Sequence, residues 1–366
     1  MYHYSRYIVR HLVHSTLLIT FSLTSIVWLT QALRFIDFIV NQGVSIAIFV
    51  KLTVLLIPSL VMMILPPSFF CAVIFVYNKL KTDSELIVMQ AAGLSKWRLA
   101  MPALQAALGV ALVGYAISLY LMPVSYGKFR DMQNYLRNNY ASILLEDGVF
   151  NTPVEGLTVF IRERDRDGVL HGILVHDHRQ PQSSITMMAE EGKLVETPQG
   201  PRFLLKNGNR QEMQNGKLSL LNFESYTLDI SLYAQGMKER PLDTQEMFLG
   251  QLFGNNDALP PEELQKRFAE AHQRIIWPAY ALTLALVALA VLLSGEFNRR
   301  GHWQRVTLAT VAGVAILFAA IGLRGETVAH AVAVPFAYLT LLLPAAAAWW
   351  ILVDHMPGNK TSKAMA

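Results

Sequence analysis

A single carboxylate at the start of a short apolar segment is the residue best placed for a specific interaction. Residues 78–99 read NKLKTDSELIVMQAAGLSKWRL and lie between two long apolar runs. Thr82 and Glu85 have the spacing of a capping box, in which a hydroxyl and a carboxylate accept hydrogen bonds from the first free backbone amides of a helix. We therefore expect a helix that begins here and ends at Gly93, because glycine often terminates helices.

This expected helix is too short to cross a membrane and too apolar for one side to face water. Residues 83–92 extend over about 15 Å at a rise of 1.5 Å per residue, which is about half of what a bilayer core requires. Apolar side chains, including Leu86, Val88 and Met89, lie nearly all around it. One face can rest on the chain's own membrane helices, so we expect the other face, with Glu85 at its start, to bind a partner protein. The alternative is an ordinary interfacial turn in which Glu85 only caps a helix.

Arg34 is a second residue whose position requires an explanation. It follows the first long apolar run, next to Phe35. The count of spans puts it outside the cytoplasm, where basic residues are uncommon. A salt bridge to Asp37, or extension of the side chain to the lipid head groups, explains it structurally. The functional alternative is a contact with an anionic ligand.

The sequence lacks the motifs of common enzyme classes. His176 and His178 share a strand face, and His171 is nearby, but no further metal ligand follows at a set spacing. We interpret all three as solvent-exposed strand histidines. There is no GxxxxGK[ST] phosphate loop and no HExxH, CxxC or GxSxG motif. We therefore predict no catalytic residues, no metal and no cofactor in this chain, and we assign any ATP hydrolysis to a separate subunit.

The composition is that of a membrane protein with a sizeable polar part. Of the 366 residues, 53% are hydrophobic and 16% are charged, whereas soluble domains carry about 25% charged residues. A mean hydropathy of only +0.33 shows that polar residues dilute the apolar runs. The net charge of +4 is not gathered in one stripe, which argues against a nucleic-acid partner. Because Cys71 is the only cysteine, an exported domain would fold without an internal disulfide.

Six apolar runs are long enough to span a bilayer, and they fall into two groups of three. Arg6 and Arg10 precede the first run, but no cleavage site follows it, so we expect a retained helix and no signal peptide. Pro66 and Pro67 interrupt the second run, where we expect the helix to kink or unwind. The six runs cover residues 12–33, 46–76, 99–122, 275–293, 306–323 and 332–353.

Basic residues place the short loops and both termini in the cytoplasm. Lys79, Lys81, Lys96 and Arg98 flank the short helix, and Arg305 precedes the fifth run. Three crossings from a cytoplasmic start then put the segment between the third and fourth runs outside the cytoplasm. Charge and span count thus agree on three helices, an outside domain and three further helices.

The outside segment has the pattern of an all-β domain. Short alternating segments are separated by Asp167-Gly168, Asn207-Gly208 and Asn215-Gly216, which are hairpin signals. We therefore predict a β-sandwich or jelly roll outside the membrane. The expected strands are 157–162, 169–176, 184–189, 193–196, 202–206, 211–214, 217–223 and 226–230.

The predicted fold class is a membrane α-helical bundle of six transmembrane helices, arranged 3+3, with an inserted extracytoplasmic all-β jelly-roll domain. This layout indicates a permease subunit that a separate ATPase drives. The alternative is a non-transporting membrane scaffold or sensor whose outside β domain binds an envelope ligand. The predicted domains are 1–123 for the first three helices with a cytoplasmic coupling helix at 82–93, 124–272 for the β domain and its connector, 273–355 for the last three helices, and 356–366 for a cytoplasmic tail.

Several segments resemble the LptF/LptG family of lipopolysaccharide export permeases. The run KLKTDSELIVMQAAGLSK at 79–96 resembles the coupling-helix region of this family, and its GLSK ending is more similar to the LptF branch than to LptG. The RYIVR opening, the QALRF end of the first run and the AEAHQRI entry into the fourth run are similar as well. The resemblance covers the layout of the whole chain.

The resemblance implies an exporter of the bacterial inner membrane that extracts lipopolysaccharide and passes it to a periplasmic bridge. In this family LptF and the paralogous permease LptG form a heterodimer on a dimer of the ATPase LptB, with LptC attached. By position, the residues that would couple to the ATPase are Glu85, Leu86, Val88, Met89 and Gly93. Both termini would lie in the cytoplasm and the β domain in the periplasm.

The same resemblance implies a lipid site. Arg34 and Phe35 match the outer end of the first helix, in the cavity where the family binds phosphorylated lipid A. Arg324 is the only basic residue at the outer end of the fifth run in this chain. The first and fifth helices would form gates with LptG, and the jelly roll would hand lipid to LptC. An amphiphile with several acyl chains and phosphates needs an apolar cavity with a few cations, which agrees with these assignments.

Overall fold

A computed structural model of the chain shows two compact units. The helical unit comprises residues 1–36, 50–129 and 242–366, and the β unit comprises 37–49 and 130–241. The residues that the structure describes are 2–36, 45–140, 147–154, 156–165, 169–180, 183–197, 200–214, 217–229, 242–254, 259–294 and 303–354.

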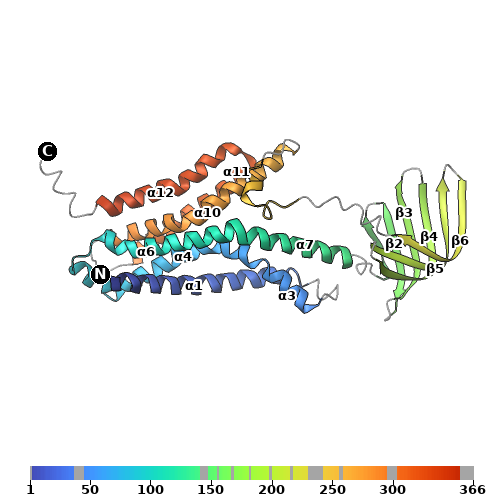
Figure 1. Cartoon of the computed structure of the whole chain (residues 1–366), viewed down its shortest axis with the longest axis horizontal. Coiled ribbons are helices and arrows are strands. Elements are labelled where there is room, and N and C mark those ends of the chain that lie inside the picture. The colour runs from blue at the N-terminus through green and yellow to red at the C-terminus, as the bar shows by residue number, and fades with distance from the viewer. Residues whose placement is uncertain are drawn as a thin grey trace. The chain divides into compact units, whose positions relative to one another are not determined.

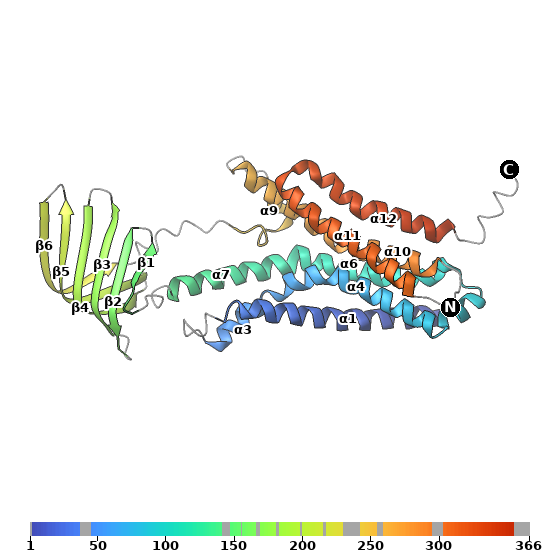
Figure 2. The ribbon, with the colours of Figure 1, turned by 180° about the vertical axis from the view of Figure 1, so that it is seen from behind.

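Within these residues, six helical segments are long and apolar enough to cross a membrane, as predicted. Figures 1 and 2 show the long helices running side by side. The spans are formed by α1 (Tyr2–Leu33), α3 (Ile46–Val54) followed by α4 (Ile57–Thr82), α6 (Lys96–Ala116) followed by the π-helical turn η1 (Ile117–Leu121) and α7 (Met122–Tyr140), α10 (Pro261–Leu293), α11 (Trp303–Ala329) and α12 (Val334–Asp354). The shorter helices are α5 (Glu85–Ala91), α9 (Leu249–Leu252) and the 3-10 turn η2 (Ala331–Ala333).

Helix α10 is the centre of the helical unit. It lies against α4, α6, α11 and α12. In α10, 72% of the most apolar stretch is buried inside the protein. In each of the other five spans, only 11–33% of the corresponding stretch is buried. Those spans keep apolar faces that the chain does not cover, such as Leu17, Phe21 and Ile26 on α1. These faces suit contact with lipid or with another membrane protein.

Helix α4 continues through Pro66 and Pro67, so the helix does not unwind there. Proline has no N–H for the carbonyl four residues before it. The carbonyl oxygen of Met62, which Pro66 leaves free, accepts a hydrogen bond of 3.0 Å from the indole Nε1 of Trp277 on α10. The second span is interrupted instead at residues 55–56, between α3 and α4.

A second backbone carbonyl that lacks its helical donor because of a proline lies where α10 meets the turn η1. Pro278 leaves the carbonyl oxygen of Arg274 free, and the Ser118 hydroxyl donates to that oxygen at 3.3 Å. The Tyr115 hydroxyl donates to the following carbonyl oxygen, that of Ile275, at 2.8 Å. Side chains of α6 and η1 therefore bind the part of α10 whose own hydrogen bonding is interrupted.

The β unit contains one antiparallel sheet in which each strand pairs with the next strand in sequence. The predicted insertion of an all-β domain is confirmed. The jelly-roll topology is not confirmed, because a jelly roll needs two sheets joined in Greek-key order, and the described strands form a single meander. The strands are β1 (Phe150–Val154), β2 (Leu157–Arg164), β3 (Val169–Gln180), β4 (Ser183–Thr197), β5 (Gly200–Gln214) and β6 (Lys217–Asp229).

Three strands are longer than predicted, because the expected breaks lie inside them. Each of β4, β5 and β6 joins two segments that were predicted as separate strands. The hairpin predicted at Asn207 and Gly208 is wrong, since Asn207 adopts a left-handed φ of 51° within β5 and Gly208 pairs with Ala189 and Phe223 on the two neighbouring strands. The other two predicted turns, at 167–168 and 215–216, lie outside the described residues.

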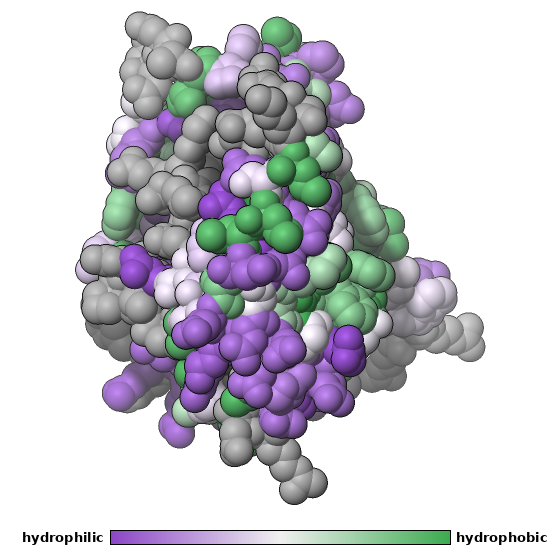
Figure 3. Space-filling model, turned by 90° about the vertical axis from the view of Figure 1, so that its right-hand side faces the viewer, coloured by the Kyte–Doolittle hydropathy of each residue, from purple (hydrophilic) through white to green (hydrophobic). Residues whose placement is uncertain are grey.

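One side of the sheet forms the core of the β unit. Alternate residues of β2, namely Leu157, Val159 and Ile161, are buried there, as expected when successive side chains point to opposite faces of a strand. On β6, Leu218 and Leu220 are exposed instead. Figure 3 shows such a mixture, with hydrophobic side chains in patches between hydrophilic ones on the face it displays.

Candidate functional site

The predicted short helix is present, but it begins later than expected. Helix α5 covers Glu85–Ala91, in place of the expected 82–93. Thr82 is the last residue of α4, and its hydroxyl donates back to the carbonyl oxygen of Asn78 at 2.9 Å. The predicted capping box is therefore wrong. Ser84, at the N-cap of α5, makes no capping hydrogen bond and has a left-handed φ of 61°.

Gly93 ends the helix, as predicted. Its φ of +87° lies in the left-handed region, which favours glycine. The N–H of Gly93 donates to the carbonyl oxygen of Gln90 at 2.9 Å, and that of Leu94 donates to Met89 at 3.1 Å. These two hydrogen bonds define a Schellman motif. Met89 and Leu94 also pack against the core of the helical unit, so the end of α5 is fixed to the bundle.

The two faces of α5 differ in exposure. Leu86 is only 4% exposed and belongs to the core of the helical unit, with Met89 packed against that core. Val88 is 67% exposed, and Ala91 and Ala92 are exposed beside it. The uncovered surface is therefore small and mostly apolar, with Gln90 as its exposed polar side chain.

Glu85 is bound by the first span. The hydroxyl of Tyr7 on α1 donates to Oε1 of Glu85 at 3.2 Å, and the Tyr7 ring packs edge-on against His11 with centroids 4.5 Å apart. The carboxylate thus joins α5 to α1. Sequence reasoning missed this partner, because nothing in the spacing of the two residues indicates that they meet.

The three residues predicted to contact lipid lie in two separate places. Arg34 is exposed in the turn that follows α1. The ring of Phe35 packs edge-on against Phe129 of α7, with centroids 5.7 Å apart. The proposed structural partner Asp37 lies outside the described residues. Arg324 lines a cavity to which neither Arg34 nor Phe35 contributes.

Arg324 belongs to an ion-pair cluster that sequence reasoning did not identify. Its Nη2 lies 3.3 Å from Oε2 of Glu270, and Nε of Arg274 lies 3.1 Å from Oε1 of the same carboxylate. The side chains of Glu270 and Arg274 are 9% and 0% exposed, whereas that of Arg324 is 47% exposed. The spacing of Glu270 and Arg274, one helical turn apart in AEAHQRI, was the available signal; Arg324 comes from a different helix.

Arg274 also holds the connector that leads from the β unit into α10. Its Nη1 donates to the carbonyl oxygen of Met247 at 2.6 Å, and its Nη2 donates to that of Thr244 at 2.9 Å. Met247 packs with Leu252 and Ala271 in a small apolar cluster. A buried charge is stable only when it is paired and hydrogen-bonded, and this guanidinium has three partners.

A cavity of about 270 Å³ lies beside this cluster. Glu270 and Arg324 contribute charged groups to its lining, and Met62, Trp277 and Ile321 contribute apolar ones. The lining residues come from α4, α7, α10, α11 and the connector. Ser59, Gln245 and Gln273 also line it, so the wall is a mixture of apolar and polar groups. This volume suits a head group or part of one acyl chain.

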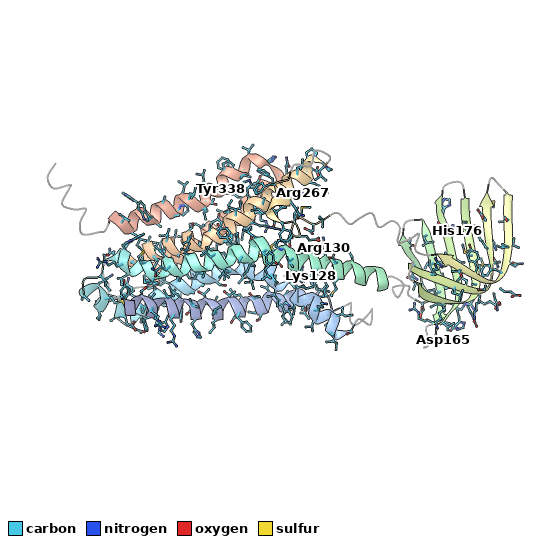
Figure 4. All side chains as sticks on the ribbon, viewed as in Figure 1. Lys128, Arg130, Asp165, His176, Arg267 and Tyr338 are labelled. Atoms are coloured by element: carbon cyan, nitrogen blue, oxygen red, sulfur yellow. The ribbon has the colours of Figure 1, made fainter. Side chains whose placement is uncertain are left out.

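The histidines of the β unit bind neighbouring side chains. Nε2 of His171 lies 3.0 Å from Oδ2 of Asp165, and this hydrogen bond raises the pKa of His171. Nδ1 of His176 lies 2.9 Å from the Thr186 hydroxyl, and the His176 ring stacks on that of His178 at 6.4 Å. Asp165 and His176 are labelled in Figure 4. Among the described residues, no three His, Cys, Asp or Glu side chains are grouped so that they could hold a metal ion.

Known proteins are similar to this chain over 78–84% of its length. The chain is 33% identical over 313 residues to an uncharacterised protein of Rickettsia prowazekii (strain Madrid E), covering 84% of this chain and 86% of that protein. It is 26% identical over 297 residues to the lipopolysaccharide export system permease protein LptF of Escherichia coli (strain K12), covering 78% of each. The LptF of Shigella flexneri matches with the same identity and coverage. A family model described as lipopolysaccharide export system permease LptF/LptG matches residues 6–354, a range that includes all six spans and the β unit, and the chain therefore belongs to the LptF/LptG family of inner-membrane permeases for lipopolysaccharide transport.

Proposed function

We propose that this chain is the LptF-type subunit of an ATP-driven exporter, which extracts lipopolysaccharide from the inner membrane and passes it to a periplasmic bridge. Family membership and the similarity to Escherichia coli LptF support the assignment. The single observation that carries the mechanism is the two-sided packing of α5. Leu86 fixes this helix to the bundle, while Val88 faces outward.

Helix α5 is the element on which the ATPase acts in this proposal. Hydrolysis takes place on a separate LptB-type dimer, which binds the exposed face of α5 around Glu85 and Val88. Because α5 begins three residues after the end of α4, and because Tyr7 ties Glu85 to α1, a displacement of α5 reaches two membrane spans. Gly93 and Met89 fix the other end of the helix.

The remaining partners in this proposal are those of the LptF/LptG family. An LptG-type paralogue meets the apolar faces of α1 and α11, on which Phe21 and Phe318 are 76% and 72% exposed. Lipopolysaccharide phosphates are bound by Arg34 and Arg324, with Phe35 beside the first of them, and an LptC-type protein takes the lipid from the β unit. In this orientation α5 and both termini lie in the cytoplasm and the β unit in the periplasm.

Charge reversal on α5 tests this proposal. Full-length wild-type chain, Glu85→Arg and Asp83→Arg are each expressed with the other exporter components and purified in detergent. We expect Glu85→Arg to recover far less ATPase subunit and to release little lipopolysaccharide per ATP. Asp83→Arg is the matched control, because it makes the same charge change two residues earlier, outside α5, and should behave like wild type.

Normal ATPase recovery and normal transport by Glu85→Arg would contradict the role of α5. If the wild-type chain itself recovers neither an ATPase nor lipid, the non-transporting scaffold or sensor becomes the better description of the protein. The two failures are separate, since the first concerns one helix and the second concerns the whole assembly.

A further inference from the structure

We propose that Glu270 is an internal counter-ion which a phosphorylated lipid head group replaces at Arg324, and that its carboxylate weakens the binding of anionic amphiphiles to the cavity beside α10. The inference rests on the proposed function in one respect, namely that Arg324 meets the transported lipid. It adds a residue that sets how tightly the cavity binds an anionic lipid.

Only one of the two arginines that bind Glu270 is free to change partners. Arg274 is fully buried, and its Nε, Nη1 and Nη2 each donate to an oxygen within the protein. The side chain of Arg324 is 47% exposed and donates to Glu270 through Nη2 at 3.3 Å. Because Arg274 holds the other oxygen of Glu270, the carboxylate stays in place and paired when Arg324 turns to a ligand.

The charge of the cluster favours an additional anion. Two guanidinium groups and one carboxylate leave a net charge of +1, next to a cavity with Met62, Trp277 and Ile321 in its wall. The side chain of Arg324 is 47% exposed, so water screens its charge in part, and Glu270 is its partner until a ligand arrives. The indole of Trp277 is itself fixed by its hydrogen bond to the Met62 carbonyl oxygen, which keeps this wall in position.

The competition between carboxylate and ligand lowers the affinity for every anionic head group. The free-energy cost of parting Arg324 from Glu270 is the same for each ligand, and the carboxylate repels each of them. A phosphate monoester carries a charge of about −1.5 to −2 at pH 7 and three acceptor oxygens, and it binds guanidinium in the strong bidentate geometry. A dianionic phosphate therefore displaces Glu270 more readily than a monoanionic phosphodiester does.

The test measures lipid binding to the full-length chain in detergent. The probes are dioctanoyl phosphatidic acid, which carries a phosphate monoester, and dioctanoyl phosphatidylglycerol, which carries a phosphodiester; inorganic phosphate alone is the third ligand. Brominated acyl chains quench nearby tryptophan fluorescence, and Trp277→Phe identifies the part of the signal that comes from the cavity. We expect the wild-type chain to bind phosphatidic acid at least fivefold more tightly than phosphatidylglycerol.

Glu270→Gln removes the competing charge and keeps the shape of the side chain. We expect this variant to bind both lipids at least fivefold more tightly than wild type, with a gain for phosphatidic acid at least as large as that for phosphatidylglycerol, so that the preference between them is kept. Arg324→Gln should lose the preference altogether. The double variant should lack the preference as Arg324→Gln does, because the preference depends on the guanidinium of Arg324.

Glu270→Gln also deprives Arg274 of its carboxylate partner, so its folding is checked first by size-exclusion chromatography. If Glu270→Gln does not fold, the comparison of wild type with Arg324→Gln tests the proposal. Arg324→Gln should fold, because it changes a half-exposed side chain. The preference for phosphatidic acid must then be present in the first and absent in the second.

Three results would overturn the proposal: equal binding of both lipids by wild type, a folded Glu270→Gln that binds no more tightly, or inorganic phosphate that displaces phosphatidic acid at equal concentration. The last result would identify a site for free phosphate. Association with an ATPase is measured separately, so the exporter assignment and the counter-ion can each fail without the other.

Discussion

Arg274 and Arg324 bind the same carboxylate, yet their losses have different consequences. Removing Arg274 leaves the carbonyl oxygens of Thr244 and Met247 without their donor and takes the nearer partner from the buried Glu270. Breaking a buried charge pair typically costs about 3–5 kcal/mol, because the remaining charge is uncompensated. A half-exposed pair contributes about 0–1 kcal/mol after solvent screening.

We therefore expect Arg274→Met to lower the stability of the purified protein by about 3 kcal/mol. The matched control is Arg324→Met, which removes the other guanidinium from Glu270 and should cost less than about 1 kcal/mol. Thermal unfolding in detergent, followed by tryptophan fluorescence, compares the two variants. Equal losses of stability would show that Arg274 does not hold the connector.

The His171–Asp165 contact in the β unit makes stability depend on pH. The hydrogen bond that His171 donates to the Asp165 carboxylate raises the pKa of His171 in the folded protein. A raised folded-state pKa adds stability that is fully present below the unfolded-state pKa of about 6.5 and is lost as the pH rises through the folded-state value. Asp165→Asn should therefore reduce stability at pH 5.5 and leave it unchanged at pH 8.

A histidine titration by NMR checks this directly. In Asp165→Asn the pKa of His171 should fall toward its ordinary value, while the strand pairing of β2 and β3 should persist. An unchanged His171 titration would mean that Asp165 is not its partner in solution.

Helix α5 depends on the backbone of Gly93 more than on any side-chain cap. Alanine at a left-handed φ costs about 1–2 kcal/mol, and a Cβ at Gly93 would meet no atom within 4 Å, so only the backbone conformation is at issue. We expect Gly93→Ala to lower stability by about 1 kcal/mol and to weaken ATPase association.

Gly109→Ala provides the comparison for Gly93. A Cβ at Gly109 in α6 also meets open space, but this glycine is within a regular helix, where alanine is favoured by about 0.5–1 kcal/mol. Its stability should therefore be equal to or above that of wild type. If both variants behave alike in thermal unfolding and in ATPase recovery, the Schellman motif is not what positions α5.

The six spans and the short helix could be predicted because their signals are local. A run of about twenty apolar residues is sufficient to indicate a span, and Gly93 marks the end of α5 by its residue type alone. The continuity of the long strands β4, β5 and β6 could not be predicted in the same way. Asn207-Gly208 has the composition of a turn, but pairing with a strand on each side keeps it inside β5.

The ion-pair cluster could be predicted only in part for a related reason. Glu270 and Arg274 are one helical turn apart, so their pairing can be expected from sequence. Their other partners cannot: Thr244 and Met247 contribute backbone oxygens, which no residue type reveals, and Arg324 is 54 residues further along the chain. The Tyr7–Glu85 hydrogen bond joins residues 78 positions apart and has no local signal either.

At the scale of the whole molecule, the proposed mechanism depends on which side of the membrane each unit occupies. Lys79, Lys81, Lys96 and Arg98 surround α5, and an excess of basic residues in short loops is typical of the cytoplasmic side. Only the third span separates α5 from the β unit in the chain, so we expect the β unit on the opposite side. An ATPase in the cytoplasm can reach α5 only in this orientation.

Cysteine labelling tests that orientation directly. Cys71 is exposed and is the only cysteine, so Cys71→Ala gives a background without reactive thiols. On this background we introduce Asp83→Cys beside α5 and Leu220→Cys on β6, both at exposed positions. A membrane-impermeant maleimide applied to intact spheroplasts should label Leu220→Cys and should label Asp83→Cys only after lysis. The reverse pattern would place α5 in the periplasm, where no ATP is available, and would exclude its action as the coupling helix.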